Sequence, residues 1–112
     1  MEIKDRVLIV EDDKNIRKFI QTILEANDYD VISTETGKEA YSLITSRCPD
    51  VVILDLGLPD MDGMKILKEV RAWSNMPIIV VSARDHEKDK VEALDMGADD
   101  YLTKPFGVME LI

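Results

Sequence analysis

Hydrophobic residues in this chain form short continuous runs that alternate with segments of helical spacing. Three of the runs are four residues long and contain no polar side chain: 7–10, 51–54 and 78–81. The segment 31–32 is a shorter run, and residues 101–103, which follow turn residues at 97–100, are expected to form a short fifth strand. A strand that is buried on both faces is apolar throughout, so these runs predict a parallel sheet covered by helices on both sides.

The segments between the runs carry apolar residues at steps of three and four, which is typical of one face of a helix. Such spacing occurs in 16–24, 40–44, 64–70 and 91–94. The last of these predicts a short helix with Val91 and Leu94 on its apolar face. Strands that alternate with helices favour βαβ units with right-handed crossovers, so the predicted fold class is α/β.

The length of 112 residues corresponds to one domain. Residues 109–112 resemble the opening of a fifth helix, and a helix that short is marginal by itself. We therefore expect one domain over 1–112, with its last helix truncated.

Composition and charge narrow the possible functions. Lys and Arg number 14 against 23 Asp and Glu, and the net charge of −9 weighs against nucleic-acid binding by these residues, because phosphate backbones need a basic face. No apolar run approaches the roughly 20 residues of a membrane span, and residues 1–5 contain no apolar signal segment, so a cytoplasmic protein is expected. A single cysteine, Cys48, and a single histidine, His86, exclude an internal disulfide and a Cys-rich or His-pair metal site.

Polar side chains collect where the predicted strands end. In an open α/β sheet, ligands bind outside the carboxyl ends of the strands. The residues that follow the runs at this edge are Glu11, Asp12, Asp13, Asp55, Ser82 and Lys104. The sequence therefore predicts that acids from two strands converge with one hydroxyl and one amine.

Converging carboxylates repel one another. At the spacing of neighbouring strands, about 5 Å, two of them repel by about 3 kcal/mol at an effective dielectric constant near 20. A raised pKa, a bound cation or the Lys104 ammonium could offset this repulsion, and an all-oxygen site suits Mg²⁺. The acids after the first run could also be only a solvated helix N-terminus. That alternative suits Asp13 but does not explain Asp55, which follows a buried strand.

The turn after the first strand is acidic and lacks the glycine-rich cradle of a nucleotide-binding or flavin-binding site. A transient phosphoryl group is compatible with these residues, because an aspartate can act as a nucleophile and carry an aspartyl phosphate. A cation would bridge the phosphoryl oxygens, and Lys104 would supply a second positive charge. The Ser82 hydroxyl could donate a hydrogen bond to another phosphoryl oxygen.

Four segments carry a resemblance to a known family: VLIVEDD at 7–13, VVILDLGLPDMDG at 51–63, VVSA at 80–83 and GADDYLTKPF at 97–106. Together they resemble the receiver domain of bacterial two-component response regulators. The resemblance extends from about residue 6 to residue 111. It implies a flavodoxin-like (CheY-like) fold, which is a doubly wound parallel sheet of five strands in the order 2-1-3-4-5 with helices on both faces.

The resemblance also implies roles at the acidic edge. Asp55 corresponds to the phosphoacceptor. Glu11 and Asp12 correspond to the metal-binding pair, and Asp55 and the backbone carbonyl of Gly57 complete the protein ligands of Mg²⁺.

Further roles follow for residues of the last two strands. Ser82 and Lys104 correspond to the hydroxyl and the amine that sense the phosphoryl group, and Ala83 belongs to the phosphate-binding set. Tyr101 corresponds to the switch aromatic. We expect Ser82 to move toward a phosphoryl group and Tyr101 to fill the vacated space from an outward rotamer. Pro105 corresponds to a proline that usually follows a cis bond.

Residues 97–106 further resemble the OmpR/PhoB-type subfamily, whose members are transcription factors with a winged-helix DNA-binding domain after the receiver. This implies a sensor histidine kinase as partner and a homodimer through the fourth helix, fifth strand and fifth helix. We expect the DNA-binding domain in the full-length protein and not within 1–112, which leaves dimerisation of this segment open. Asp99 and Asp100 are turn residues or salt-bridge partners across that dimer, whereas Asp60 and Asp62 are interpreted as turn formers.

Three other functions compete with this interpretation. An aspartate-nucleophile phosphohydrolase needs a second acid two residues after the nucleophile, where this chain has Gly57, so at most slow self-phosphorylation and self-dephosphorylation are expected. A phosphorylation-independent interaction module would not need the acids, Ser82 and Lys104. A flavin-binding electron carrier is disfavoured by the acidic first turn and an aromatic content of 5%.

Overall fold

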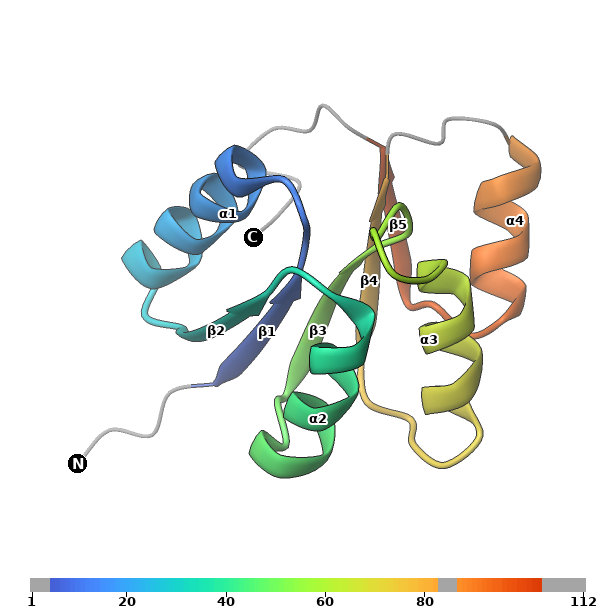
Figure 1. Cartoon of the computed structure of the whole chain (residues 1–112), viewed down its shortest axis with the longest axis horizontal. Helices are drawn as coiled ribbons and strands as arrows, with labels where there is room; N and C mark the ends of the chain where they lie inside the picture. The colour runs from blue at the N-terminus through green and yellow to red at the C-terminus, as the bar shows by residue number, and fades with distance from the viewer. Residues whose placement is uncertain (1–4, 83–86, 104–112) are drawn as a thin grey trace.

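The computed structural model of the chain describes residues 5–82 and 87–103, except for the side chains of Glu87 and Thr103. Strands and helices alternate along it (Figure 1). The elements are β1 (Arg6–Val10), α1 (Lys14–Ala26), β2 (Asp30–Thr34), α2 (Gly37–Arg47), β3 (Val51–Asp55), α3 (Gly63–Arg71), β4 (Ile78–Ser82), α4 (Glu87–Asp95) and β5 (Asp100–Thr103). The α/β prediction is thus confirmed, and the predicted fifth helix at 109–112 lies outside the described residues.

The five strands form one parallel sheet in the order β2-β1-β3-β4-β5, as predicted. The chain starts at β1, adds β2 on one side, and then crosses to the other side for β3. The order therefore reverses between β1 and β3. In open α/β sheets this reversal point is where ligands bind, at the carboxyl ends of the strands.

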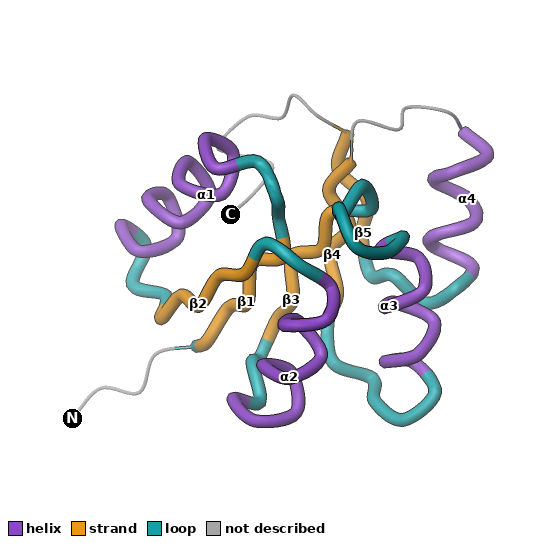
Figure 2. Tube along the Cα trace, viewed as in Figure 1, coloured by secondary structure: helices purple, strands orange, loops and turns teal. Residues whose placement is uncertain are grey.

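Both faces of the sheet are covered, which explains why the strand runs contain no polar residue (Figure 2). Alternation along β1 shows the two sides. Leu8 and Val10 pack in a cluster with buried residues of α2, α3 and α4. Val7 and Ile9 pack in a second cluster with Ile20 of α1. Two separate cores thus fix the sheet between its helices.

Asp13 and Asn27 mark the ends of α1. The Asp13 carboxylate accepts hydrogen bonds from the backbone N–H groups of Asn15 and Ile16, at 2.9 and 3.2 Å. It is an ordinary N-cap, as the helix-terminus interpretation of this residue predicts. At the other end Asp28 has a φ of 67°, a left-handed conformation that aspartate tolerates and that turns the chain into β2.

Helix α4 differs from the prediction in the face that it buries. Val91 and Leu94 are 47% and 40% exposed, whereas Ala93 is fully buried. The helix covers the edge strand β5, and the small Ala93 side chain allows close approach there. The apolar spacing therefore predicts the helix correctly and its buried face wrongly.

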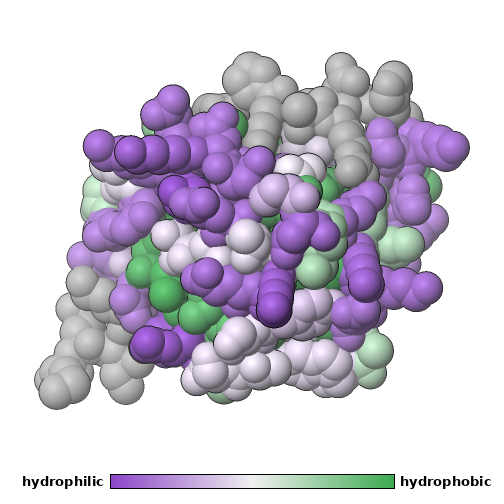
Figure 3. Space-filling view, viewed as in Figure 1, coloured by the Kyte–Doolittle hydropathy of each residue, from purple (hydrophilic) through white to green (hydrophobic). Residues whose placement is uncertain are grey.

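The surface is mainly hydrophilic on the face shown in Figure 3, with smaller hydrophobic areas between the polar side chains. This agrees with a composition in which charged residues make up 33%. Within residues 5–82 and 87–103, none of the helices combines the length and the apolar character that crossing a membrane requires.

Arg71, the last residue of α3, joins three segments at the amino-terminal edge of the sheet. Its guanidinium donates to the carbonyls of Gly97 and Ser74, at 2.8 and 3.3 Å, and pairs with Asp99 at 2.9 Å. Asp99 Oδ2 also accepts the backbone N–H of Ile78 at 2.8 Å. Asp99 is therefore an intrachain partner that holds the α4–β5 turn against the start of β4.

We expect the Arg71→Ala variant to lose about 2 kcal/mol of unfolding free energy, because it removes charge-assisted hydrogen bonds from a side chain that is 15% exposed. Urea denaturation would measure the loss. Lys68→Ala, an exposed position on the same helix, is the control and should cost less than about 0.5 kcal/mol. Equal stability of the two variants would contradict the role given to Arg71.

Candidate functional site

The register of β1 and β3 brings the acidic segments together. Val10 pairs with Leu54 in the parallel ladder, so Glu11 and Asp55, which follow these residues, lie side by side. Glu11 also continues the ladder on its other side, because its N–H donates to the Thr34 carbonyl at 3.0 Å. The sheet itself therefore positions the first two carboxylates.

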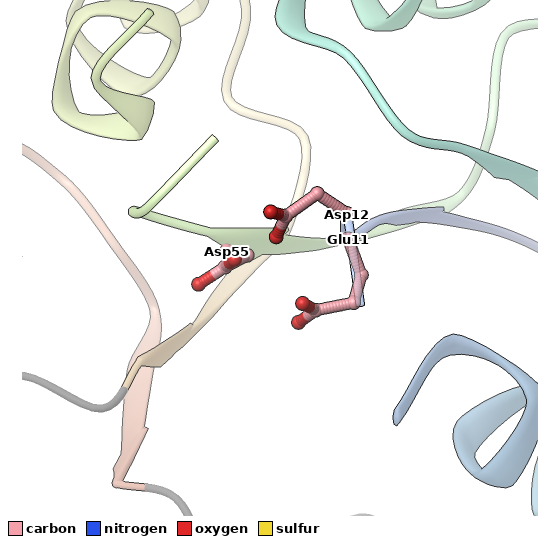
Figure 4. Close-up of side chains that lie close together, drawn as sticks. All are labelled: Glu11, Asp12 and Asp55. Carbon is pink, nitrogen blue, oxygen red and sulfur yellow. The ribbon is translucent and has the colours of Figure 1, made fainter. Parts of the chain in front are cut away.

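Glu11, Asp12 and Asp55 each contribute a carboxylate oxygen to a cluster in which these atoms all lie within 4.8 Å of one another. Figure 4 shows the carboxylates of the β1 end turned toward Asp55. Glu11 and Asp55 are buried, at 1% and 5% exposure, and Asp12 is exposed. The predicted convergence of acids from two strands is thus present in the structure.

Backbone N–H groups stabilise two of the three carboxylates. The Asp13 N–H donates to Glu11 Oε1 at 3.1 Å, and the Gly57 N–H donates to Asp55 Oδ1 at 3.3 Å. Carboxylates at this separation still repel by about 3 kcal/mol per pair at an effective dielectric constant near 20. An all-oxygen donor set with one solvent-exposed member suits a hard divalent cation that keeps part of its water shell.

The β3–α3 loop holds Gly57 at the edge of this cluster. Its neighbours Leu56 and Leu58 are buried in the core on the α2 and α3 side of the sheet, whereas Gly57 itself is exposed. An isolated antiparallel bridge between Gly57 and Asp62 closes the loop. Two buried leucines thus anchor the loop and leave Gly57 facing solvent.

Gly63, the first residue of α3, is a further residue of the site that the sequence analysis missed. A Cβ at this position would collide with the backbone oxygen of Asp55 and would lie 2.8 Å from Leu56 Cα. The Gly63 N–H donates to the Leu56 carbonyl at 2.9 Å. Only glycine lets α3 begin against the backbone that carries Asp55. The available signal was a glycine directly after the Asp62 N-cap.

Ser82 and Tyr101 lie on the strands beyond β3. Val81 pairs with Asp55, so Ser82 stands one residue further toward the carboxyl edge, and it is 2% exposed. Tyr101 of β5 pairs with Val80. Its side chain is 5% exposed and packs in the core cluster of α2, α3 and α4. The outward rotamer expected for Tyr101 is therefore not the arrangement found here.

Three residues of the predicted site, Ala83, Lys104 and Pro105, lie outside the described residues. Their predicted roles remain predictions. His86 lies outside the described residues as well.

Two aspartates of the β3–α3 loop are helix caps. Asp62 Oδ1 accepts the Met64 N–H at 2.9 Å and caps α3 locally. Asp60 instead reaches α2, where its two oxygens accept the N–H groups of Gly37 and Lys38 at 2.9 and 3.0 Å. These hydrogen bonds, the one from Gly37 first, hold the pKa of the Asp60 carboxyl below its usual range. The sequence analysis missed this role because the partners are far away along the chain.

Comparison with known proteins places the chain in a family. It matches the response regulator receiver domain family over residues 7–112. It is 52% identical over 105 residues to the KDP operon transcriptional regulatory protein KdpE of Escherichia coli K12, a match that covers 94% of this chain and 47% of that protein. It is 48% identical over 106 residues to the transcriptional regulatory protein KdpE of Mycobacterium tuberculosis H37Rv, covering 95% and 47%. The chain thus spans about half the length of these relatives.

Solved structures show the same fold. The receiver domain of the Francisella response regulator 1452 has a TM-score of 0.92 at 44% identity, over 97% of this chain and 91% of that one. The BeF3-activated N-terminal receiver domain of Klebsiella pneumoniae RstA has a TM-score of 0.91 at 32% identity, over 96% and 92%. The Mn²⁺-bound form of the response regulator Rcp1 has a TM-score of 0.84 at 25% identity, over 96% and 86%. Matches of this extent in sequence and in fold show that the chain belongs to the response regulator receiver domain family, as a KdpE-like member of the OmpR/PhoB type.

Proposed function

We propose that Asp55 accepts a phosphoryl group from a sensor histidine kinase in a reaction that depends on Mg²⁺. The observation that carries this proposal is the cluster of Glu11, Asp12 and Asp55 oxygens within 4.8 Å of one another. Membership in the receiver domain family supports a histidine kinase as the donor.

The residues at this edge fit the metal. Glu11, Asp12 and Asp55 would hold Mg²⁺ through carboxylate oxygens, and Gly57 would add its backbone carbonyl. When bound, the cation neutralises charge on the phosphoryl oxygens. The cation site also accounts for a cluster of carboxylates that would otherwise repel one another.

The chain's own residues position the transfer. One Asp55 oxygen attacks phosphorus while the phosphorus–nitrogen bond of the phosphohistidine breaks, and the nitrogen keeps the electron pair of that bond. The Gly57 N–H holds Asp55 Oδ1. Ser82, at the end of β4, would donate its hydroxyl to a phosphoryl oxygen, with Ala83 beside it in the phosphate-binding set. Lys104 would supply a second positive charge.

Turnover as a phosphatase is not part of this proposal. A general acid and base would have to stand two residues after Asp55, and Gly57 occupies that position. We therefore assign the chain a regulatory role with at most slow self-phosphorylation and self-dephosphorylation.

The output would pass through Ser82 and Tyr101 to the surface of α4 and β5. Phosphorylation adds charge and strong acceptor oxygens, which would draw the Ser82 hydroxyl and shift the packing of Tyr101. The relatives are named as transcriptional regulators and are about twice as long as this chain. We therefore assign the full-length protein a DNA-binding effector domain and a cytoplasmic location, and we assign the α4 and β5 face the role of a homodimer surface.

Mg²⁺ binding can be tested with Asp12→Ala. Removing one ligand carboxylate should weaken Mg²⁺ binding at least tenfold, measured by NMR titration of the backbone amides near Gly57. Asp13→Asn is the matched control, because asparagine is an equally good N-cap and the variant loses the same charge one residue away. If the two variants bind Mg²⁺ equally well, Asp12 is not a ligand.

Phosphorylation can be tested by mass spectrometry with acetyl phosphate and Mg²⁺. The wild-type chain should gain the mass of one phosphoryl group, and Asp55→Asn should gain none because the amide is not a nucleophile for this transfer. Asp13→Asn should behave as the wild type does. Phosphorylation of Asp55→Asn would place the acceptor elsewhere.

The relay can be tested with Ser82→Ala. This variant should still be phosphorylated, but the amide shift changes around α4 and β5 should be lost, since the hydroxyl that contacts the phosphoryl group is missing. Identical shift patterns in the phosphorylated variant and the phosphorylated wild type would contradict the relay.

A further inference from the structure

Arg17 of α1 connects the main chain of Glu11 to the β2–α2 loop. Its Nη1 donates to the Glu11 carbonyl at 2.9 Å, and its Nη2 pairs with Glu35 Oε1 at 3.1 Å. The Arg17 side chain is 15% exposed, so it is held in place, whereas Glu35 is 65% exposed. The Glu11 N–H donates to the Thr34 carbonyl, so both backbone polar groups of Glu11 are hydrogen-bonded.

Asp60 connects the same region to the loop that carries Gly57. The two Asp60 oxygens accept the N–H groups of Gly37 and Lys38, the first two residues of α2. The next residue, Met61, packs so closely on Gly37 that an added Cβ would lie 2.6 Å from its Cγ and Sδ. A hydrogen-bonded pair and a packing contact thus fasten the β3–α3 loop to the start of α2.

Both connections end on one continuous stretch just after β2, residues 35–38, which we call the brace. Arg17 contacts it through Glu35, and Asp60 contacts it through Gly37 and Lys38. A continuous series of contacts therefore runs from the Glu11 carbonyl through Arg17 of α1 and the brace to Asp60 of the β3–α3 loop. It links the two sides of the acidic cluster by a path outside the sheet.

The sheet does not supply this link by itself. Its ladder pairs Val10 with Leu54, which is the last pair of β1 and β3 in this register. Glu11 lies one position beyond that pair and is hydrogen-bonded to Thr34 of β2, whereas Gly57 lies three positions beyond it, in a segment that backbone pairing between β1 and β3 does not fix. Their separation needs another determinant, and contacts behind the ligands of a metal commonly set it.

We propose that Arg17 and Asp60 are positioning residues of the metal site, acting through the brace to set the separation between Glu11 and the Gly57 loop. The proposal rests on the proposed function in one respect, which is that this cluster binds Mg²⁺. Neither residue needs to touch the cation. Each acts through a backbone segment that carries a ligand.

The test compares two variants that break the chain of contacts at different places. Glu35→Ala removes the exposed partner of Arg17 and leaves α1 intact, and Asp60→Ala removes the connection to α2. Each should weaken Mg²⁺ binding by roughly tenfold in an NMR titration, the lower end of the range for outer contacts of metal ligands. Because either change opens the same chain, the double variant should also lose roughly tenfold rather than a hundredfold.

Matched controls separate positioning from charge and stability. Lys18→Ala and Asp28→Asn change exposed charges outside the brace, and asparagine tolerates the left-handed conformation found at residue 28. Both should bind Mg²⁺ within about twofold of the wild type. Asp60→Asn keeps one acceptor oxygen for α2 and should fall between Asp60→Ala and the wild type.

A second readout is independent of the cation. Without Mg²⁺, hydrogen exchange at the Gly57 amide should be several-fold faster in Asp60→Ala than in the wild type, while amides in the middle of β3 keep their rates. Unchanged exchange at Gly57 would overturn the proposal, as would multiplicative losses in the double variant. If the wild type itself binds no Mg²⁺, the proposed function fails, and the exchange measurement still decides whether Asp60 positions the loop.

Discussion

The packing of carboxylates at the end of a parallel sheet is the constraint on which this structure depends. Parallel pairing of β1 with β3 places Glu11 beside Asp55, and the next residue adds Asp12. Two of these side chains are almost fully buried, where charge is costly unless something compensates it. Backbone N–H groups compensate part of that charge. A divalent cation would compensate the remainder, and this need supports the proposed Mg²⁺ site.

Contacts in the surrounding loops hold the carboxylates close together despite their mutual repulsion. Gly63 brings the positive end of α3 against the backbone of Asp55, and a larger residue there would force the two apart. Leu56 and Leu58 anchor the intervening loop in the core. The position of Asp55 is therefore supported both by the packing of Leu56 and Leu58 in the core and by the close approach of α3.

The proposed relay would run through the same arrangement. Ser82 ends the strand next to β3, and Tyr101 lies on the strand after that, so a change at Asp55 has two strands to cross before it reaches α4. Helix α4 buries the small Ala93 and leaves Val91 and Leu94 exposed among charged residues. Arg71 and Asp99 hold the turn after α4.

The sequence by itself determined the elements, their order and the carboxylates that meet, because uninterrupted apolar runs require a two-sided parallel sheet and such a sheet collects whatever follows its strands. The four segments that resemble the receiver domain family can also be identified from the sequence alone. Only the tertiary structure decided which face α4 buries, where Tyr101 rests, and that Asp60 and Arg17 reach the same loop. These features depend on contacts between residues far apart in the chain, such as Asp60 with Gly37, and local periodicity carries no information about side chains that meet only after the chain has folded.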